Sequence, residues 1–254
     1  MTSQTVPRLT WSQVMAWRVR RHHLDTRAPR NDLLDVVATI GGLHAQVMSS
    51  AELTAWARVD QLAPGDVPDA LWEQRSLVKT WAMRGTLHLL PSSEYGLWQS
   101  ALSTYRHFLK PSWSKAFGLT PDDLDRMNDA ITTALDGRQL TREELAAEVV
   151  RLVGDETLGE KMTHSFGSTL KPAAFRGHLC FGPNRGRNIT FARPDQWIGD
   201  TNAVDPEEAI TELIRRFLAT NGPATREEVA RWWAITPATA TRYRKRLGKD
   251  AVDV

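Results

Sequence analysis

The stretch GRQLTREELA, residues 137–146, returns later in the chain as GPATREEVA, residues 222–230. In both copies a glycine follows a long amphipathic run, and a threonine then stands three residues before a glutamate. A threonine with glutamate at that spacing is typical of a capping box, in which each residue satisfies the other's free backbone N–H at a helix start. Two helices around a capped turn form a helix-turn-helix, and the repeat predicts this unit twice.

The residues after the first copy predict a β-hairpin. Two short apolar strands, 179–182 and 189–192, flank an Asn- and Gly-containing turn that carries Arg185 and Arg187. A helix-turn-helix followed by a basic hairpin is a winged helix. The first 105 residues fit a looser version of the same unit. Helices are expected over 9–23, 31–40, 50–62 and 67–74, and Gly41-Gly42 would end the second of them. Two strands are expected over 77–83 and 86–90, with the turn between them near Arg84-Gly85.

The fold class expected is therefore mainly α with short β-hairpins, arranged as tandem winged-helix units. We place them at residues 1–105, 106–200 and 201–254. A further helix is expected over 165–176 in the second unit. The third unit is expected to be incomplete at its C-terminus, because only residues 251–254 remain to begin a strand after a helix over 237–247.

Composition restricts the function classes. No apolar run is long enough to span a membrane, and residues 1–8 lack the apolar core of a signal peptide. Cys180 is the single cysteine, so no internal disulfide is possible and a reducing, cytoplasmic location fits. No C-x-x-C or H-E-x-x-H motif occurs, and we expect neither a metal nor a cofactor.

The charge distribution points to a polyanion as partner. Residues 1–31 contain six arginines against a single acidic residue, Asp25, and residues 161–194 contain six Lys or Arg and no acidic residue. A basic face on a nearly neutral protein suits a polyanion such as nucleic acid. The alternative is a solvated basic loop. The candidate DNA-binding residues are Arg84, Thr86, His88, Lys171, Arg176, Arg185, Arg187 and Arg193.

The connector GGLHAQVM, residues 41–48, places an imidazole and an amide two residues apart. In an extended segment, residues i and i+2 point to the same side, so His44 and Gln46 would face one spot while Leu43, Ala45 and Val47 pack inward. Such a pair can hold and polarise a water, or stabilise a cation through the amide oxygen. The alternative is a structural pair that bonds the loop backbone.

Two further features have competing interpretations. Arg84, Thr86 and His88 are expected on one face of a strand, where they could line a phosphate site or form a buried network between domains. The ten tryptophans are many for this length. We expect core packing for six of them: Trp11, Trp17, Trp56, Trp72, Trp81 and Trp98.

Three stretches, LTWSQVMAWRVRRHHL (9–24), GGLHAQVMSSAELTAWARV (41–59) and LVKTWAMRGTLHLLP (77–91), resemble the AlkZ/YcaQ group of winged-helix DNA glycosylases. The resemblance implies tandem winged helices, with a further C-terminal β-rich region in that group, and excision of alkylated purines that include bulky N7-alkylguanines and interstrand crosslinks. The group's catalytic signature is Gln-aliphatic-Gln or Gln-aliphatic-Asp. The matching positions here are His44, Ala45 and Gln46, and a branch with His first resembles enzymes that protect producers of DNA-alkylating natural products.

The expected function is therefore a monofunctional DNA glycosylase that hydrolyses the N-glycosidic bond of N7-alkylated guanine in duplex DNA, for repair or self-resistance. A neutral His44 would take the water's proton while Gln46 orients the water, and activity would fall as His44 becomes protonated. We expect a cytoplasmic, nucleoid-associated monomer. The alternatives are a DNA-binding regulator or inactive paralogue without glycosylase activity, and a protein-interaction scaffold.

Overall fold

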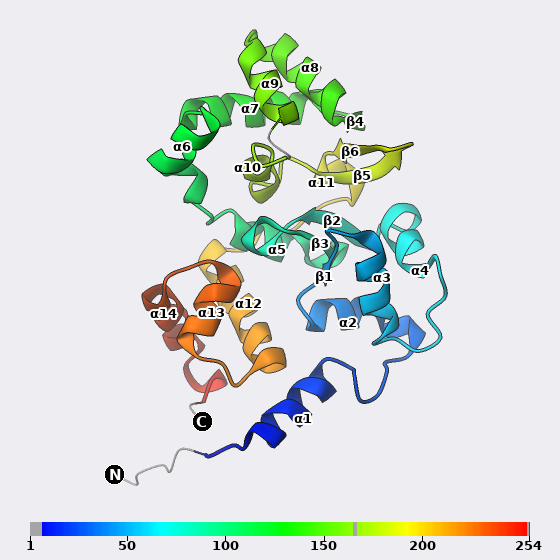
Figure 1. The fold of residues 1–254 in the computed structure, drawn as a ribbon, viewed down its shortest axis with the longest axis vertical. Helices are drawn as coiled ribbons and strands as arrows, with labels where there is room; N and C mark the ends of the chain where they lie inside the picture. Colours follow the sequence, from blue (N-terminus) through cyan, green and yellow to red (C-terminus); the bar gives the residue numbers. More distant parts are fainter. Residues whose placement is uncertain (1–6, 165–166, 253) are drawn as a thin grey trace.

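The structure is a computed structural model that describes residues 7–164, 167–252 and 254. Helices dominate, and two three-stranded antiparallel sheets lie near the middle of the molecule, as Figure 1 shows. The expected fold class, mainly α with short hairpins in winged-helix units, is confirmed. Within the described residues, every helix is too short or too polar to cross a lipid bilayer.

The first winged helix surrounds the first sheet. Its order is helix, strand, two helices and hairpin: α2 (Leu33–Thr39), β1 (Leu43–His44), α3 (Met48–Trp56), α4 (Asp66–Pro68) continuing as a π-helical turn (Asp69–Glu73), β2 (Leu77–Trp81) and β3 (Leu87–Pro91). The strands lie in the order β1-β3-β2, with both neighbouring pairs antiparallel. The predicted hairpin is present, and β1 is the short third strand that the winged helix adds to it.

Gly41 and Gly42 determine how the chain enters β1. Both have positive φ angles, +77° and +95°, which end α2 and turn the chain sharply. A Cβ atom at Gly42 would lie 2.7 Å from Leu90 Cδ2 and 3.0 Å from the Leu89 carbonyl oxygen. The absence of a side chain therefore lets β1 begin directly against β3.

The second winged helix has a similar order of elements, with three helices rather than two between the short strand and the hairpin. It comprises α7 (Pro121–Ala134), β4 (Leu140–Thr141), α8 (Arg142–Val153), α9 (Glu156–His164), α10 (Lys171–Phe175), β5 (Cys180–Arg185) and β6 (Asn188–Ala192). Its sheet order, β4-β6-β5, matches that of the first unit. The helix expected over 165–176 is shorter than predicted, since α10 covers only 171–175; residues 165 and 166 lie outside the described residues. Connections are made by α5 (Tyr95–Leu102), α6 (Pro111–Phe117) and α11 (Pro194–Trp197).

Both predicted capping boxes are confirmed. The Glu144 N–H donates to Thr141 Oγ1 at 3.2 Å and the Thr141 N–H donates to Glu144 Oε2 at 2.8 Å, and Thr225 with Glu228 forms the same pair. In the second unit Thr141 is thus both the last residue of β4 and the cap of α8. The first unit differs, because Ala45–Val47 separate β1 from α3 and the cap residue Val47 makes no side-chain capping bond. We call residues 45–47 the β1–α3 spacer.

The third helical group contains α12 (Pro206–Asn221), α13 (Arg226–Trp233) and α14 (Pro237–Leu247), followed by a short 3₁₀ turn. Among residues 248–252 no strand is present. The N-terminal helix α1 (Trp11–Arg21) lies beside α12 in Figure 1. Arg21 donates to the carbonyl of Ala219, in the last turn of α12, at 3.2 Å, and Arg18 donates to the carbonyl of Pro223, just beyond the helix, at 2.8 Å.

The contact between α1 and α12 crosses the predicted limits of the first unit. The three-unit division of the chain therefore stays a prediction, although each winged helix keeps its own sheet. In α1 only Val14 is buried, because the arginines provide the docking. Trp11 is 77% exposed and Trp17 and Trp56 are about half exposed, so the expectation of core packing was wrong for these three. Trp81 and Trp98 are buried, as predicted.

Candidate functional site

His44 and Gln46 lie at the outer edge of the first sheet. Leu43 and Ala45 are completely buried, whereas His44 and Gln46 are exposed. The Ala45 N–H donates to the Leu87 carbonyl at 2.7 Å, which extends the β1–β3 pairing by one bond beyond the strand. This alternation is that of extended backbone and confirms the predicted path.

The spacer then departs from the prediction at Val47, whose side chain is 58% exposed rather than packed inward. Val47 has extended angles and is the N-cap residue immediately before α3, so its side chain no longer follows the sheet. The exposed surface at this edge consequently combines an imidazole, an amide and an apolar side chain on consecutive or alternate residues.

His88, on the neighbouring strand β3, contacts His44. The two residues are register partners in the β1–β3 pair, and their rings meet edge to face with centroids 5.4 Å apart at 81°. His88 is only 7% exposed, and its Nδ1 lies 3.0 Å from the Thr86 carbonyl oxygen. Burial lowers the pKa of His88 to about 4, with smaller contributions from His44 and Arg84, so the ring is neutral near neutral pH.

The three residues Arg84, Thr86 and His88 do not share one strand face, and that expectation was wrong. Arg84 lies in a 3₁₀ turn (Met83–Gly85) with φ at +56°, and its side chain is exposed. Thr86 precedes β3 and donates its hydroxyl to the Met83 carbonyl at 2.9 Å. Arg84 and Thr86 therefore lie in the turn between the strands and only His88 lies in β3, so the three side chains are not aligned on one face.

Residues from later parts of the chain contact this turn. The Arg84 N–H donates to the Tyr105 hydroxyl at 3.4 Å, and that hydroxyl donates to the Trp233 carbonyl at 2.9 Å. A Cβ at Gly85 would lie 3.3 Å from Lys171 Nζ, so the α10 lysine reaches the turn. Partial burial lowers the pKa of Lys171. The fold thus brings the predicted cations Arg84 and Lys171 to one corner.

The tip of the second hairpin presents two arginines in different states. Arg185 binds Glu144 Oε1 at 2.7 Å and donates to the Gln139 carbonyl at 2.7 Å, so it ties the wing to the start of α8. Arg187 is exposed and makes no hydrogen bond or ion pair with the parts of the chain that the structure describes. Of the pair, Arg187 is the one free to meet an incoming anion.

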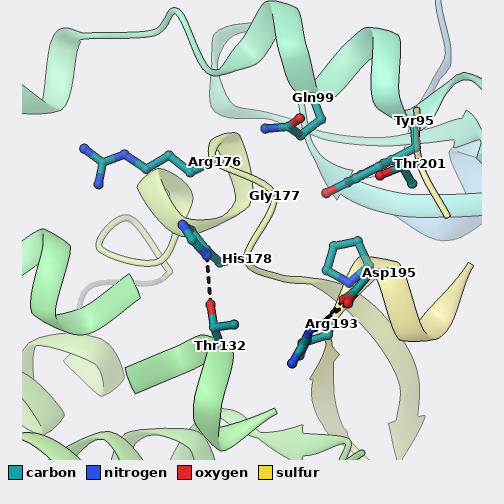
Figure 2. Close-up of a pocket in the computed structure, with 10 residues that line it drawn as sticks. Tyr95, Gln99, Thr132, Arg176, Gly177, His178, Arg193, Asp195 and Thr201 are labelled. Carbon is teal, nitrogen blue, oxygen red and sulfur yellow. Dashed lines mark hydrogen bonds and ion pairs between the residues drawn. The ribbon is translucent and has the colours of Figure 1, made fainter. Parts of the chain in front are cut away.

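Arg176 and Arg193 border a separate cavity of about 300 Å³, shown in Figure 2. Arg176 pairs with Asp125 at 2.5 Å, and Arg193 pairs with Asp195 at 2.6 Å and with Asp136 at 2.9 Å. These carboxylates neutralise the positive charge of both arginines at the cavity. Tyr95, His178 and Thr132 also line the cavity, and its lining includes no residue of the β1–α3 spacer or of the first hairpin.

Sequence reasoning missed these carboxylate partners and the cavity. The acidic residues lie outside the basic segment 161–194, so the absence of acidic residues inside that segment did not reveal them. No local signal pointed to two of these pairs, because Asp125 and Arg176 are 51 positions apart and Glu144 and Arg185 are 41 apart. Asp195 is only two residues from Arg193, just beyond the segment that was counted. His88 was identified as a site residue, but its burial beside His44 could not be deduced without knowing the strand register.

Two winged helices and a solvent-facing His/Gln pair at the edge of the first sheet define a winged-helix protein with a candidate hydrolytic site. The family model "DNA glycosylase AlkZ-like" matches residues 37–254, and the chain belongs to this family. It is 41% identical over 250 residues to an "Interstrand DNA cross-link repair glycosylase" of Streptomyces sahachiroi, a match that covers 94% of this chain and 64% of that protein.

A solved structure leads to the same family. The Streptomyces sahachiroi DNA glycosylase AlkZ superposes with a TM-score of 0.86 at 38% identity, over 95% of this chain and 66% of that one. The chain therefore spans about two thirds of the length of the relatives that it matches.

Proposed function

We propose that this protein is a monofunctional DNA glycosylase that hydrolyses the N-glycosidic bond of N7-alkylated guanine, including bulky or crosslinked adducts, in duplex DNA. The observation that carries the proposal is the pair His44 and Gln46 on extended backbone, both exposed while Leu43 and Ala45 between and before them are buried. Family membership and the repair-glycosylase relative support it.

The residue types suit a leaving group that is already charged. Alkylation at N7 makes guanine cationic, so departure of the base needs no strong general acid. The remaining tasks are to deliver a water and to stabilise the developing positive charge on the sugar. His44 accepts the water's proton at a ring nitrogen, and Gln46 orients the same water through its amide. Guanine N7 lies in the major groove, so an adduct there is accessible from outside the base stack.

Duplex DNA would be held largely through its phosphates. Arg84 and Lys171 at the first hairpin turn and Arg187 at the second are the cations best placed to do so. Arg185, Arg176 and Arg193 already have carboxylate partners and would have to exchange them. His88 and Thr86 are weaker DNA contacts, since His88 is buried and the Thr86 hydroxyl already donates to a carbonyl. The proposal includes a monomeric protein that acts at the nucleoid and that serves in self-resistance to alkylating genotoxins.

The test is single-turnover excision from a duplex with one N7-alkylguanine, scored as abasic sites, beside measurement of duplex affinity. His44→Ala and Gln46→Ala should each slow excision by about 10² to 10⁴ while binding changes little. His178→Ala removes an imidazole that lies in the separate cavity, and should excise at the wild-type rate. Equal rates for wild type and His44→Ala would refute the catalytic assignment.

The family's fold also permits a second function, a DNA-binding regulator or inactive paralogue. Two winged helices with an exposed basic hairpin support DNA binding whether or not hydrolysis occurs. If the wild-type protein binds duplex DNA but leaves the alkylated base in place, the regulator function replaces the glycosylase function.

A further inference from the structure

A row of three polar residues crosses the first sheet. His44 on β1 pairs in register with His88 on β3, and His88 pairs with Thr80 on β2. Residues directly opposite each other in antiparallel strands project from the same face. Along this row the side chains go from exposed His44 to His88 and then to fully buried Thr80. His88 therefore lies between the exposed imidazole of His44 and the buried side chain of Thr80.

The orientation of the His88 ring is determined by its surroundings. The Thr86 carbonyl can only accept a hydrogen bond, so His88 Nδ1 carries the hydrogen that it donates across 3.0 Å. The backbone of Gly42 lies beside the ring, since a Cβ at that residue would be in ordinary contact with His88 Cδ2, at 3.7 Å. A buried ring bonded at one nitrogen and enclosed by backbone has little freedom to rotate.

The opposite holds for His44, which is exposed and belongs to a two-residue edge strand. Its ring contacts His88 edge to face, and such contacts are worth about 0.5–1.5 kcal/mol, or roughly a two- to tenfold preference for the contacting rotamer. A general base must be held at hydrogen-bond distance from its water, so the fraction of time in that rotamer scales the rate.

We propose that His88 is a positioning residue for the candidate general base, and that its immobile ring holds the His44 imidazole in the orientation that activates water. This role rests on the proposed glycosylase function. It replaces the DNA contact that the sequence predicted for His88, and it explains why a histidine is buried next to an exposed histidine. His88 does not touch substrate; it acts through His44.

The kinetic test compares His88→Leu, which removes the ring, with His88→Phe, which keeps a ring edge but loses the donor. In single-turnover excision with saturating enzyme, His88→Leu should lower the rate about two- to tenfold, with duplex Kd unchanged. His88→Phe should recover most of that loss. A rate for His88→Phe no better than for His88→Leu, or a matching loss of DNA affinity in both, would overturn the proposal.

A spectroscopic test separates this inference from the proposed function. Ring nitrogen and carbon-bound proton resonances of His44, with nuclear Overhauser contacts between the His44 and His88 rings, report the His44 orientation in the free protein. His88→Leu should move His44 to averaged, solvent-like shifts, and His88→Phe should not. If wild type lacks glycosylase activity but shows this ordering, the proposed function fails and the positioning role stands. If the His44 signals are the same in wild type and His88→Leu, the positioning role is wrong.

Discussion

Burial of a neutral histidine makes this protein sensitive to mild acid. The pKa of His88 falls from 6.5 to about 4 on folding, mainly because burial disfavours the charged ring. At about 1.4 kcal/mol for each tenfold change in proton affinity, this shift corresponds to roughly 3 to 4 kcal/mol. Above pH 6.5 both folded and unfolded chains hold a neutral ring, so nothing is lost there. Between pH 6.5 and about 4 only the unfolded chain gains the proton, and the free energy of unfolding falls by up to roughly 1.4 kcal/mol per pH unit.

Urea unfolding followed by tryptophan fluorescence, repeated from pH 7.5 to 4.5, measures this loss. The comparison is His88→Phe, which keeps a ring in place and cannot titrate. Burial also lowers the pKa values of His22, His107 and His178, but their contribution is common to both proteins and cancels in the difference. The wild type should lose stability relative to the variant by about 2 to 3 kcal/mol over this range. Parallel pH curves for the two proteins would show that His88 is not buried as a neutral ring.

Three further predictions concern the turns, the caps and the wing. Gly42→Ala should lower the free energy of unfolding by about 1–3 kcal/mol, because the positive φ strains an alanine and its Cβ would press on the Leu89 carbonyl and the Leu90 side chain. Gly65→Ala, also at positive φ but with open space around it, should cost less, and similar melting temperatures would contradict the close approach. Thr141→Ala should lose about 1 kcal/mol of unfolding free energy with its capping bond, whereas Val47→Ala loses no cap; equal effects in thermal melts would be unexpected. For duplex binding, Arg187→Ala should reduce the salt slope by about 0.9, and adding Arg185→Ala should bring the reduction to at most about two. An unchanged slope in the double variant would place the interface elsewhere.

Local sequence signals predicted the parts of the fold that depend on neighbours in the chain. The threonine caps at Thr141 and Thr225 and the glycine turn before β1 act within a few residues, so their patterns carry the structure. The His44/Gln46 alternation was predictable for the same reason. Long-range partners were not predictable: the pairing of Arg185 with Glu144, and of Arg18 with the Pro223 carbonyl, depends on how elements pack. Trp11 was misplaced because an apolar side chain in a helix does not reveal whether a neighbouring element covers it.

His44 at the end of β1 and Gln46 in the β1–α3 spacer have a consequence for which substitutions this fold tolerates. In the second winged helix the residue at the end of the short strand is committed to capping a helix, so most substitutions there lower stability before they alter anything else. In the first, neither His44 nor Gln46 caps a helix or fills the core. Substitution at these two positions should therefore change the free energy of unfolding little, and under the proposed function it would act on the excision reaction instead. Under that proposal, the first and third residues of the triplet can vary while the scaffold that carries them stays the same.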